Sequence, residues 1–422
     1  MLQADFLPIG RAWDRKRDSG RNEPYFDVRS AQKFVRKLEQ EALLIALIAA
    51  YLHGKTLDGE PYRSIGIPAL LALSKRWSLE VMALDALEAQ QIFHREELKA
   101  WRERRQRLQM QSMVQQSEAQ GLKKLFVEHG LHVLPLKGYY MKDMYPKPEQ
   151  RQMCDLDLLL GEGEMEQART LMEERGYVTE HFQESHHDNY RKSPFLYVEL
   201  HRRLLSEDSP YAAGLGNMLR RAVRCPEGEY AVSWSDYYLF LLVHFAKHVE
   251  WAGCGPRSVL DVYLFKQAHG DQLDERYLHE RLSDMGMEGF RRDVEQIADD
   301  WFGPCGEEAA LTDTAREMAH EMLGSGVYGT RRQVEDNQLR RYGSKKGSVE
   351  QAGLCYLWNC IFLPRKNMQV IYPVLRKYPA LLPVCWLVRG GRMVFATPTR
   401  SWKNCRSIWR TVQRAKEKES GR

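Results

Sequence analysis

Two aspartates separated by one residue, Asp155 and Asp157, have the spacing in this chain that points most directly to chemistry. Alternate residues of a β-strand point to the same side, and two carboxylates on one side repel each other unless a cation lies between them. Glu199, in the segment YVELH, can add a third carboxylate from another strand, and an all-oxygen site of this kind suits a hard cation. We therefore expect Asp155, Asp157 and Glu199 to bind magnesium, or manganese in its place, although solvent-facing strands can carry the same spacing.

The residues near the acidic pair favour a phosphate ligand. Lys137 and Gly138 directly follow a predicted strand and precede a helix-like stretch, and Arg151 stands just before the acidic pair. A glycine at such a junction lets the backbone approach a phosphate, the start of the helix offers its amides, and lysine and arginine neutralise phosphate oxygens. We expect these three residues to contact the phosphates of a substrate.

The elements that would position these residues alternate between strand and helix. The segments GLHVLPLKG, CDLDLLLG and FLYVEL have the compositions of short strands. A helix-like stretch through Met144 follows the first of them, and helical periodicity returns from Glu164 to Arg175, just before Gly176. The middle of the chain is therefore predicted to be an α/β unit.

Helices are predicted on both sides of this unit. Apolar residues recur at helical spacing from Ser30, the expected N-cap, towards Gly54. The pattern of residues 84–108 predicts one long amphipathic helix, whose arginine-rich face WRERRQRLQ we interpret as solvated surface, with an RNA or phosphate patch as the alternative. After the unit, DYYLFLLVHFAKHVEW predicts a core helix, and a second helix is expected at residues 258–268.

One segment resembles a known family in the order as well as the content of its motifs. It reads LPLKGYYMKDMYPKPEQRQMCDLDLLLGEGEMEQARTLMEERGY and is similar to the signature of the uncharacterised nucleotidyltransferase family, part of the DNA polymerase beta-like nucleotidyltransferase superfamily. The resemblance covers roughly residues 30 to 300. It continues through further residues, namely His186, His187, Glu199, Leu200, His201, His244, His248 and Asp261.

The resemblance implies a fold and a reaction. The fold is α/β, with a small mixed nucleotidyltransferase sheet flanked by helices, Asp155 and Asp157 on one strand, and Glu199 on a neighbouring strand. The reaction is magnesium-dependent transfer of a nucleoside monophosphate from an NTP to an acceptor hydroxyl, with release of pyrophosphate and with Lys137 and Arg151 steadying the triphosphate. The acceptor stays open between a small molecule, a protein and RNA.

Two departures and one alternative accompany this expectation. Most members of the wider superfamily have Gly-Ser or Gly-Gly after the first strand, whereas this chain has Lys137-Gly138 and a longer segment up to Asp155, so the serine contact to phosphate is missing. The alternative is a noncatalytic module that binds a nucleotide, RNA or a protein, which the basic stretches 101–107 and 400–418 favour. Three converging carboxylates favour the enzyme, because their repulsion destabilises a protein that binds no metal.

The histidines have several interpretations. His187 and its neighbour His186 are expected on a loop near the site, where phosphate contact and simple exposure both fit. His244 and His248 share a helix face and suit either pocket lining or a zinc site completed by His201, which stands beside Glu199 and can orient it. Asp261 is expected to bind an N-cap or a lysine rather than to act in catalysis.

The sequence predicts five parts along the chain. They are a flexible arm at 1–29, an N-terminal helical region at 30–125, the nucleotidyltransferase-like α/β core at 126–215, a helical region at 216–330, and a C-terminal region with a basic tail at 331–422. This organisation embeds the sheet between N- and C-terminal helical regions.

Composition excludes several classes of protein. The 422 residues give room for two or three packed units, and the net charge of +5 is too small to identify a nucleic-acid binder. Eight cysteines without a CxxC pair fit a reducing compartment. No signal peptide or membrane-spanning stretch is recognisable, so we expect a cytoplasmic protein.

Overall fold

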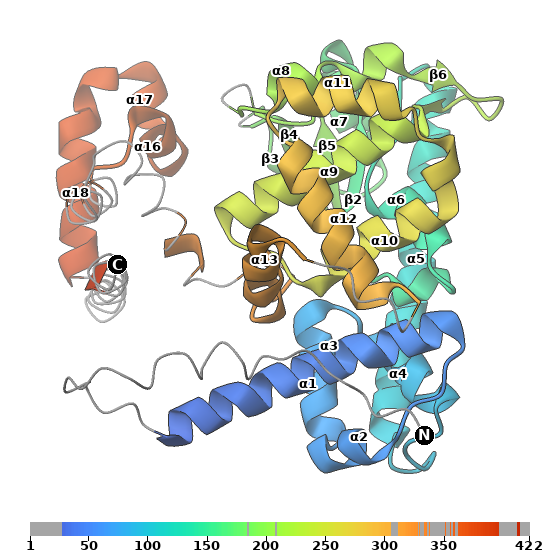
Figure 1. Ribbon diagram of the computed structural model, residues 1–422. Helices are drawn as coiled ribbons and strands as arrows, with labels where there is room; N and C mark the ends of the chain where they lie inside the picture. Colours follow the sequence, from blue (N-terminus) through green and yellow to red (C-terminus); the bar gives the residue numbers. More distant parts are fainter. Residues whose placement is uncertain are drawn as a thin grey trace.

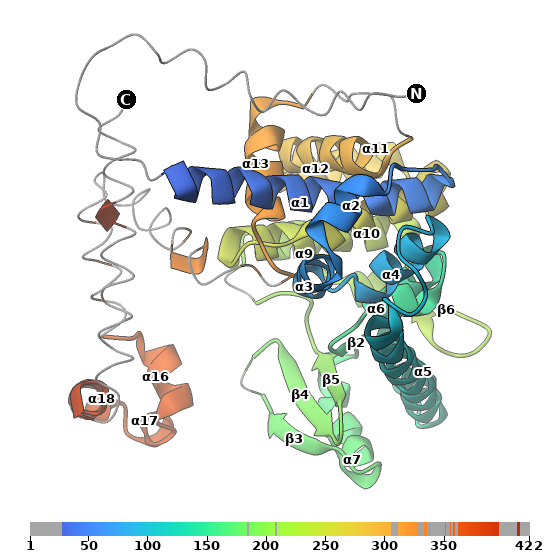
Figure 2. The same ribbon diagram turned by 90° about the horizontal axis from the view of Figure 1, so that it is seen from below.

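A computed structural model describes residues 28–183, 185–206, 209–304, 311–327 and 362–395, with isolated positions between 329 and 358 and at 412–413. Helices make up most of it, and a five-stranded mixed sheet lies beside the helical body (Figures 1 and 2). This architecture confirms the α/β prediction of a small mixed sheet flanked by helices.

The sheet has the strand order β1-β2-β5-β4-β3. Only the central pair, β2 and β5, is parallel, and all other neighbouring strands are antiparallel. The strands are β1 (Leu134–Pro135), β2 (Leu156–Leu159), β3 (Val178–His181), β4 (His187–Lys192) and β5 (Leu196–His201). A separate two-stranded sheet consists of β6 (Val223–Arg224) and β7 (Tyr230–Ala231).

The two faces of the sheet have different chemistry. Leu158 on β2 and Leu200 on β5 are fully buried in an apolar core that also contains Leu122 and Phe126 of α5 (Lys99–Glu128). Helix α7 (Met165–Glu174) completes this core. Successive side chains of a strand point to opposite faces, so the residues directly before and after each of these leucines point to the other side of the sheet. That opposite face carries Asp157.

The described residues between 28 and 323 form thirteen α-helices. In addition to α5 and α7, they are α1 (Val28–His53), α2 (Glu60–Ile65), α3 (Ile67–Trp77), α4 (Glu80–Ala89), α6 (Gly138–Met141), α8 (Ala212–Leu215), α9 (Trp234–Trp251), α10 (Pro256–His269), α11 (Glu275–Asp284), α12 (Glu288–Phe302) and α13 (Asp313–Leu323). The predicted core helix is α9, which Ser233 caps by accepting a hydrogen bond from the Asp236 amide.

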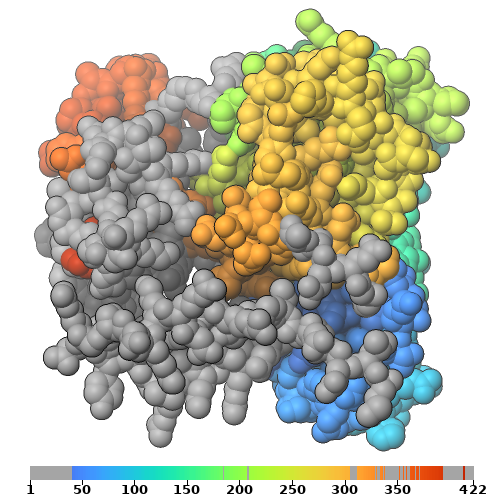
Figure 3. All heavy atoms as spheres, in the orientation of Figure 1, coloured from blue at the N-terminus to red at the C-terminus, as the bar shows by residue number. Residues whose placement is uncertain are grey.

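One apolar core joins helices that precede the sheet strands in the sequence with helices that follow them. It contains Leu47 of α1, Trp77 of α3, Phe265 of α10 and Phe302 of α12, all fully buried. The space-filling view shows the yellow and orange segment of α12 and α13 beside the blue N-terminal helices (Figure 3). The N-terminal helices therefore complete the helical body that covers the sheet.

The N-terminal helices differ from the sequence prediction in two places. Helix α1 begins at Val28, so Ser30 lies inside its first turn and is not the N-cap. The single helix predicted for residues 84–108 is wrong, because α4 ends at Ala89 and α5 begins at Lys99. Gln91 between them has a left-handed backbone with φ of 54°, which a continuing right-handed helix cannot accommodate.

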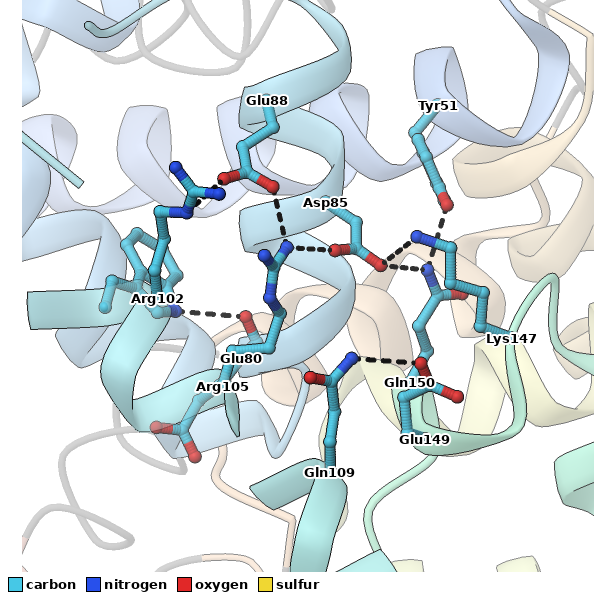
Figure 4. Close-up of polar contacts among 11 residues, drawn as sticks. Tyr51, Glu80, Asp85, Glu88, Arg102, Arg105, Gln109, Lys147, Glu149 and Gln150 are labelled. Atoms are coloured by element: carbon cyan, nitrogen blue, oxygen red, sulfur yellow. Dashed lines mark hydrogen bonds and ion pairs between the residues drawn. The ribbon is translucent and has the colours of Figure 1, made fainter. Parts of the chain in front are cut away.

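The arginine-rich face of α5 binds the acidic residues of α4 (Figure 4). Arg102 Nε lies 3.1 Å from Glu88, and Arg105 Nη1 lies 2.7 Å from the buried Asp85. Arg104 forms an ion pair with Glu80, which is the first residue of α4. These three arginines are thus neither a solvated surface nor an open RNA or phosphate patch, because each is neutralised by α4.

The C-terminal helices form a small cluster of their own. They are α16 (Arg365–Ile371), α17 (Val374–Lys377) and α18 (Leu382–Phe395), which pack around Met368, Leu375 and Cys385. Nearly all of the predicted arm at 1–29 and of the basic tail at 400–418 lies outside the described residues. None of the described helices combines the length and the apolar character needed to cross a membrane.

Candidate functional site

Asp157 and Glu199 are direct neighbours across the parallel pair of strands. In the register of β2 and β5, Asp157 lies opposite Glu199, and Leu159 lies opposite His201. Asp155 immediately precedes β2 and is two residues from Asp157, so all three carboxylates belong to the polar face of the sheet. The structure thus brings together the three acidic residues that the sequence singles out.

A lysine and a histidine neutralise Asp157, which is almost completely buried. Lys137 Nζ donates a hydrogen bond to Asp157 Oδ1 at 2.7 Å, and His201 Nε2 lies 2.9 Å from the same oxygen. Burial by itself would raise the pKa of Asp157, but Lys137 and His201 hold it well below its usual range. Asp157 therefore stays ionised, and the positive charge between the carboxylates comes from the protein's own side chains.

The backbone at Lys137 has an unusual conformation. Its φ of 41° and ψ of −113° lie outside the regions that residues other than glycine normally occupy. The hydroxyl of Tyr237 in α9 donates a hydrogen bond to the Lys137 carbonyl, which helps to hold this conformation. Although burial alone would lower the pKa of the Lys137 ammonium, Asp157 and Asp155 raise it. The result is a lysine fixed in its charged form beside the carboxylates.

Asp155 makes no hydrogen bond or ion pair with any residue in the described part of the chain. Burial and then repulsion from Asp157 raise its pKa to about 6. A carboxylate held in this way gains more from an added cation than a solvated carboxylate would. Asp155 is therefore the acid of the site whose electrostatic environment most favours a bound cation.

Glu199 and His201 form the other half of the site. His201 Nε2 lies 3.3 Å from Glu199 Oε2, and His187 Nε2 lies 3.9 Å from Glu199 Oε1. Burial raises the pKa of Glu199, yet the hydrogen bond from His201 gives a net lowering. His201 thus contacts two of the three acids, in agreement with its expected role of orienting Glu199.

The donor set fits a divalent cation. Asp157, Glu199 and His201 each offer a ligand atom, and these atoms all lie within 4.8 Å of one another. Asp155 adds a carboxylate without a partner among the described residues. The imidazole nitrogen of His201 makes the set less purely oxygen-based than the sequence suggests, which suits manganese as well as magnesium.

Arg151 lies in a different environment from the one expected for a triphosphate ligand. Its guanidinium donates two hydrogen bonds of 2.8 Å to Asp261 of α10, and both side chains are buried. The Tyr145 hydroxyl donates to the same carboxylate at 2.7 Å. Asp261 therefore has a structural partner, as expected, but this partner is an arginine rather than a lysine or an N-cap.

Gly138 has a packing role in this arrangement. A Cβ atom at this position would collide with the Met153 sulfur and would lie 2.7 Å from Arg151 Nη1. The space beside Gly138 is therefore occupied by Met153 and Arg151. The missing side chain makes room for the buried arginine, so a phosphate is not needed to explain the glycine.

The histidines form two separate groups. His187 begins strand β4, so its predicted loop position is wrong, and it lies beside His186 and His201. On α9, His244 Nε2 and His248 Nε2 are 2.8 Å apart. Burial lowers the pKa of both, to about 4 for His248. His201 belongs to two groups of possible metal ligands among the described residues, and neither group contains His244 or His248. The alternative of a zinc site formed by these three histidines is therefore not supported.

Lys247 of α9 is a site residue that the sequence analysis missed. It makes no ion pair with any described residue, and it interacts electrostatically with Lys137, Glu199 and Asp157. Burial and then repulsion from Lys137 lower the pKa of its ammonium. The available signal was its place between His244 and His248, on a helix already recognised as part of the core.

A cavity of about 300 Å³ lies at the carboxyl ends of β2 and β5. In sheets with parallel strands, ligands commonly bind at this end. The lining includes Leu159 and Leu160 after β2, Arg202 and Arg203 after β5, and residues of α8. Arg202 forms an ion pair with the buried Asp188, so the wall next to His201 is held in place.

Comparison with known families agrees with the fold. The model of a family described as uncharacterised nucleotidyltransferase matches residues 63–303, which is more than half of the chain and includes all three carboxylates. No curated protein and no solved structure matches the chain. The family match supports a transferase with a nucleotide substrate in general terms, and it confirms the resemblance seen in the motifs. The chain belongs to the uncharacterised nucleotidyltransferase family.

Proposed function

We propose that this protein is a magnesium-dependent nucleotidyltransferase that transfers a nucleoside monophosphate from an NTP to an acceptor hydroxyl. The observation that carries the proposal is the position of Asp157 opposite Glu199 in the parallel strand pair. Beside them lies Asp155, which has no hydrogen-bond or ion-pair partner among the described residues. Asp155, Asp157 and Glu199 would hold magnesium, or manganese in its place. When bound, such an ion stabilises the attacking and leaving oxygens of an in-line displacement.

The protein's own groups would bind the triphosphate and move the proton. Lys137 and Lys247 supply positive charge at the carboxylates, and Lys247 has no ion-pair partner among the described residues. The Lys137 ammonium has three N–H donors and gives one of them to Asp157, so it can bind a phosphate oxygen while it stays beside the carboxylate. Glu199 would accept the proton of the acceptor hydroxyl, with His201 holding the carboxylate in position at 3.3 Å.

The acceptor would bind in the cavity at the carboxyl ends of β2 and β5. Apolar residues such as Leu159 and Leu215 form much of its lining, and the Arg203 and Glu162 side chains form an ion pair at its edge. Its volume of about 300 Å³ is at the lower end of the range typical for small-molecule ligands. These features favour a small, partly apolar acceptor over a long RNA.

Binding of labelled NTPs with and without magnesium tests the proposal. We expect magnesium-dependent binding by the wild-type protein and its loss in an Asp155→Asn/Asp157→Asn double variant. Glu180→Gln is the matched control, because Glu180 is a carboxylate on the same sheet that pairs with Arg191. If the folded, magnesium-loaded protein binds no NTP, the proposal is wrong.

The noncatalytic alternative loses one of its two supports. The arginines of the basic stretch at 101–107 that favoured RNA binding are largely paired with α4. A pyrophosphate-release assay over a panel of hydroxyl acceptors separates the two functions. NTP binding without pyrophosphate release on any acceptor would favour the binding module.

A further inference from the structure

Three histidines gather at the edge of the carboxylate site. His186, His187 and His201 each have a ring nitrogen within 4.8 Å of those of the other two. The ring centroids of His186 and His187 are 4.6 Å apart, and those of His187 and His201 are 5.1 Å apart. The antiparallel register of β4 and β5 places His187 directly opposite His201. The sheet therefore places two of the three histidines, and His186 directly precedes β4.

Each imidazole has a polar partner for one nitrogen. Ser185 Oγ lies 3.0 Å from His186 Nδ1, Glu199 faces His187 Nε2, and Asp157 Oδ1 lies 2.9 Å from His201 Nε2. This is the arrangement found around metal-binding histidines, whose second nitrogen commonly contacts a carboxylate or another polar group. It leaves His186 Nε2 and His187 Nδ1, which face each other, as ring nitrogens that can bind a metal.

His201 supplies an independent observation. Its side chain is 5% exposed, and its Nδ1 atom is buried without a hydrogen-bond partner in the described part of the chain. Buried polar atoms are nearly always paired in folded proteins, so an unpaired ring nitrogen calls for a ligand. The ring that carries this atom belongs to the histidine cluster.

The spacing of the other two nitrogens fits a tetrahedral ion. His186 Nε2 and His187 Nδ1 are 3.3 Å apart, which is long for a hydrogen bond. Two nitrogens bound to zinc at about 2.0–2.1 Å with tetrahedral angles are about 3.3–3.4 Å apart. The pair thus already has the separation that a shared zinc ion requires.

We propose that His186, His187 and His201 bind a zinc ion or a chemically similar transition metal, with a fourth position open to water or to an anionic ligand. Three imidazoles favour such ions over magnesium, which prefers oxygen ligands. This site shares His201 with the carboxylate site, and it differs from that site in having His186 and His187 as its other ligands. It does not depend on the nucleotidyltransferase proposal, since it requires no nucleotide.

The test uses cobalt(II) as a spectroscopic probe and zinc(II) in isothermal titration calorimetry, on the full chain without nucleotide. We expect one equivalent of cobalt to give the strong visible absorption of tetrahedral coordination, and zinc to displace it. His186→Ala and His187→Ala should each abolish stoichiometric binding. Ser185→Ala, which removes only the partner of a ligand, should weaken zinc binding by roughly tenfold.

Two control variants locate the site. His181→Ala removes an exposed histidine from the adjacent strand β3, and His248→Ala breaks the helical histidine pair. Both should retain cobalt binding, as should Asp155→Asn, which tests the nucleotide site separately. The proposal is wrong if the folded wild-type protein binds no stoichiometric cobalt or zinc. It is equally wrong if His248→Ala abolishes binding while His186→Ala does not.

Discussion

Replacing Asp261 with asparagine is expected to destabilise the protein by about 3–5 kcal/mol, because it leaves the Arg151 guanidinium buried without a counter-charge. In the wild-type structure the two side chains are only 6% and 9% exposed, and two hydrogen bonds of 2.8 Å join them. The pair connects the segment before β2 to α10. Its loss therefore affects the packing between the sheet and the helical body.

The expected change in melting temperature follows from this free energy. For a cooperative unit of more than 200 residues, each kcal/mol shifts the melting temperature by about 2 °C. Asp261→Asn should thus lower it by about 6–10 °C, which circular dichroism at 222 nm can measure. Arg151→Met should produce a loss of similar size, since it leaves the carboxylate unpaired.

Two further variants make the reasoning specific. Arg316→Ala removes an exposed arginine that pairs with Asp313, and it should change the melting temperature by no more than about 2 °C. The double variant Arg151→Met/Asp261→Leu removes both charges and should recover part of the stability lost in either single variant.

Nucleotide binding separates the structural role of Arg151 from its expected phosphate contact. If Arg151→Met leaves the melting temperature unchanged but weakens NTP binding at least tenfold, the ion pair is not the main role of Arg151 and the stability argument is refuted. If the melting temperature falls and the remaining folded protein binds NTP normally, the ion pair explains this arginine.

Two other variants probe the carboxylate site and its support. Asp155→Asn is expected to raise the free energy of unfolding at pH 7.5 by about 1–2 kcal/mol, because the folded protein holds the pKa of Asp155 at about 6, above its unfolded value. Urea unfolding should show that this gain in stability shrinks as the pH falls through 6, because Asp155 of the folded wild type then becomes protonated. If the variant is no more stable than the wild type at pH 7.5, the prediction is wrong. Gly138→Ala should cost about 1–3 kcal/mol through its collision with Met153 and Arg151, and adding Met153→Ala should restore part of that loss. Equal melting temperatures for the wild type and Gly138→Ala would show that the space beside Gly138 can hold a methyl group, which contradicts this prediction.

The acidic residues of the site were predictable because their arrangement depends on local geometry. The two-residue period of a strand puts Asp155 and Asp157 on one side, and the motif order assigns Glu199 to a neighbouring strand. Strands β3 and β4 were missed because Val178–His181 is largely exposed and His187–Lys192 is polar. Strand prediction relies on apolar alternation, which the edge strand β3 and its neighbour β4 both lack.

The partners of the site residues could not be read from the sequence. Arg151 binds Asp261, which is 110 residues away, and Lys137 receives a hydrogen bond from Tyr237, which is 100 residues away. Lys247 reaches the carboxylates only because α9 packs near the polar face of the sheet. Such contacts depend on how elements that are distant in sequence pack together.

The sequence by itself therefore determined the family, through the resemblance of its motifs, and the mixed α/β class, through local periodicity. It also predicted the acidic residues of the site. Only the tertiary structure decided which positive charges neutralise those acids. It assigned Arg151 to a buried ion pair, placed Lys137 on Asp157, and gathered His186 and His187 beside His201. The reason is physical, because the charge state and the partner of a buried group are set by the groups that surround it in space.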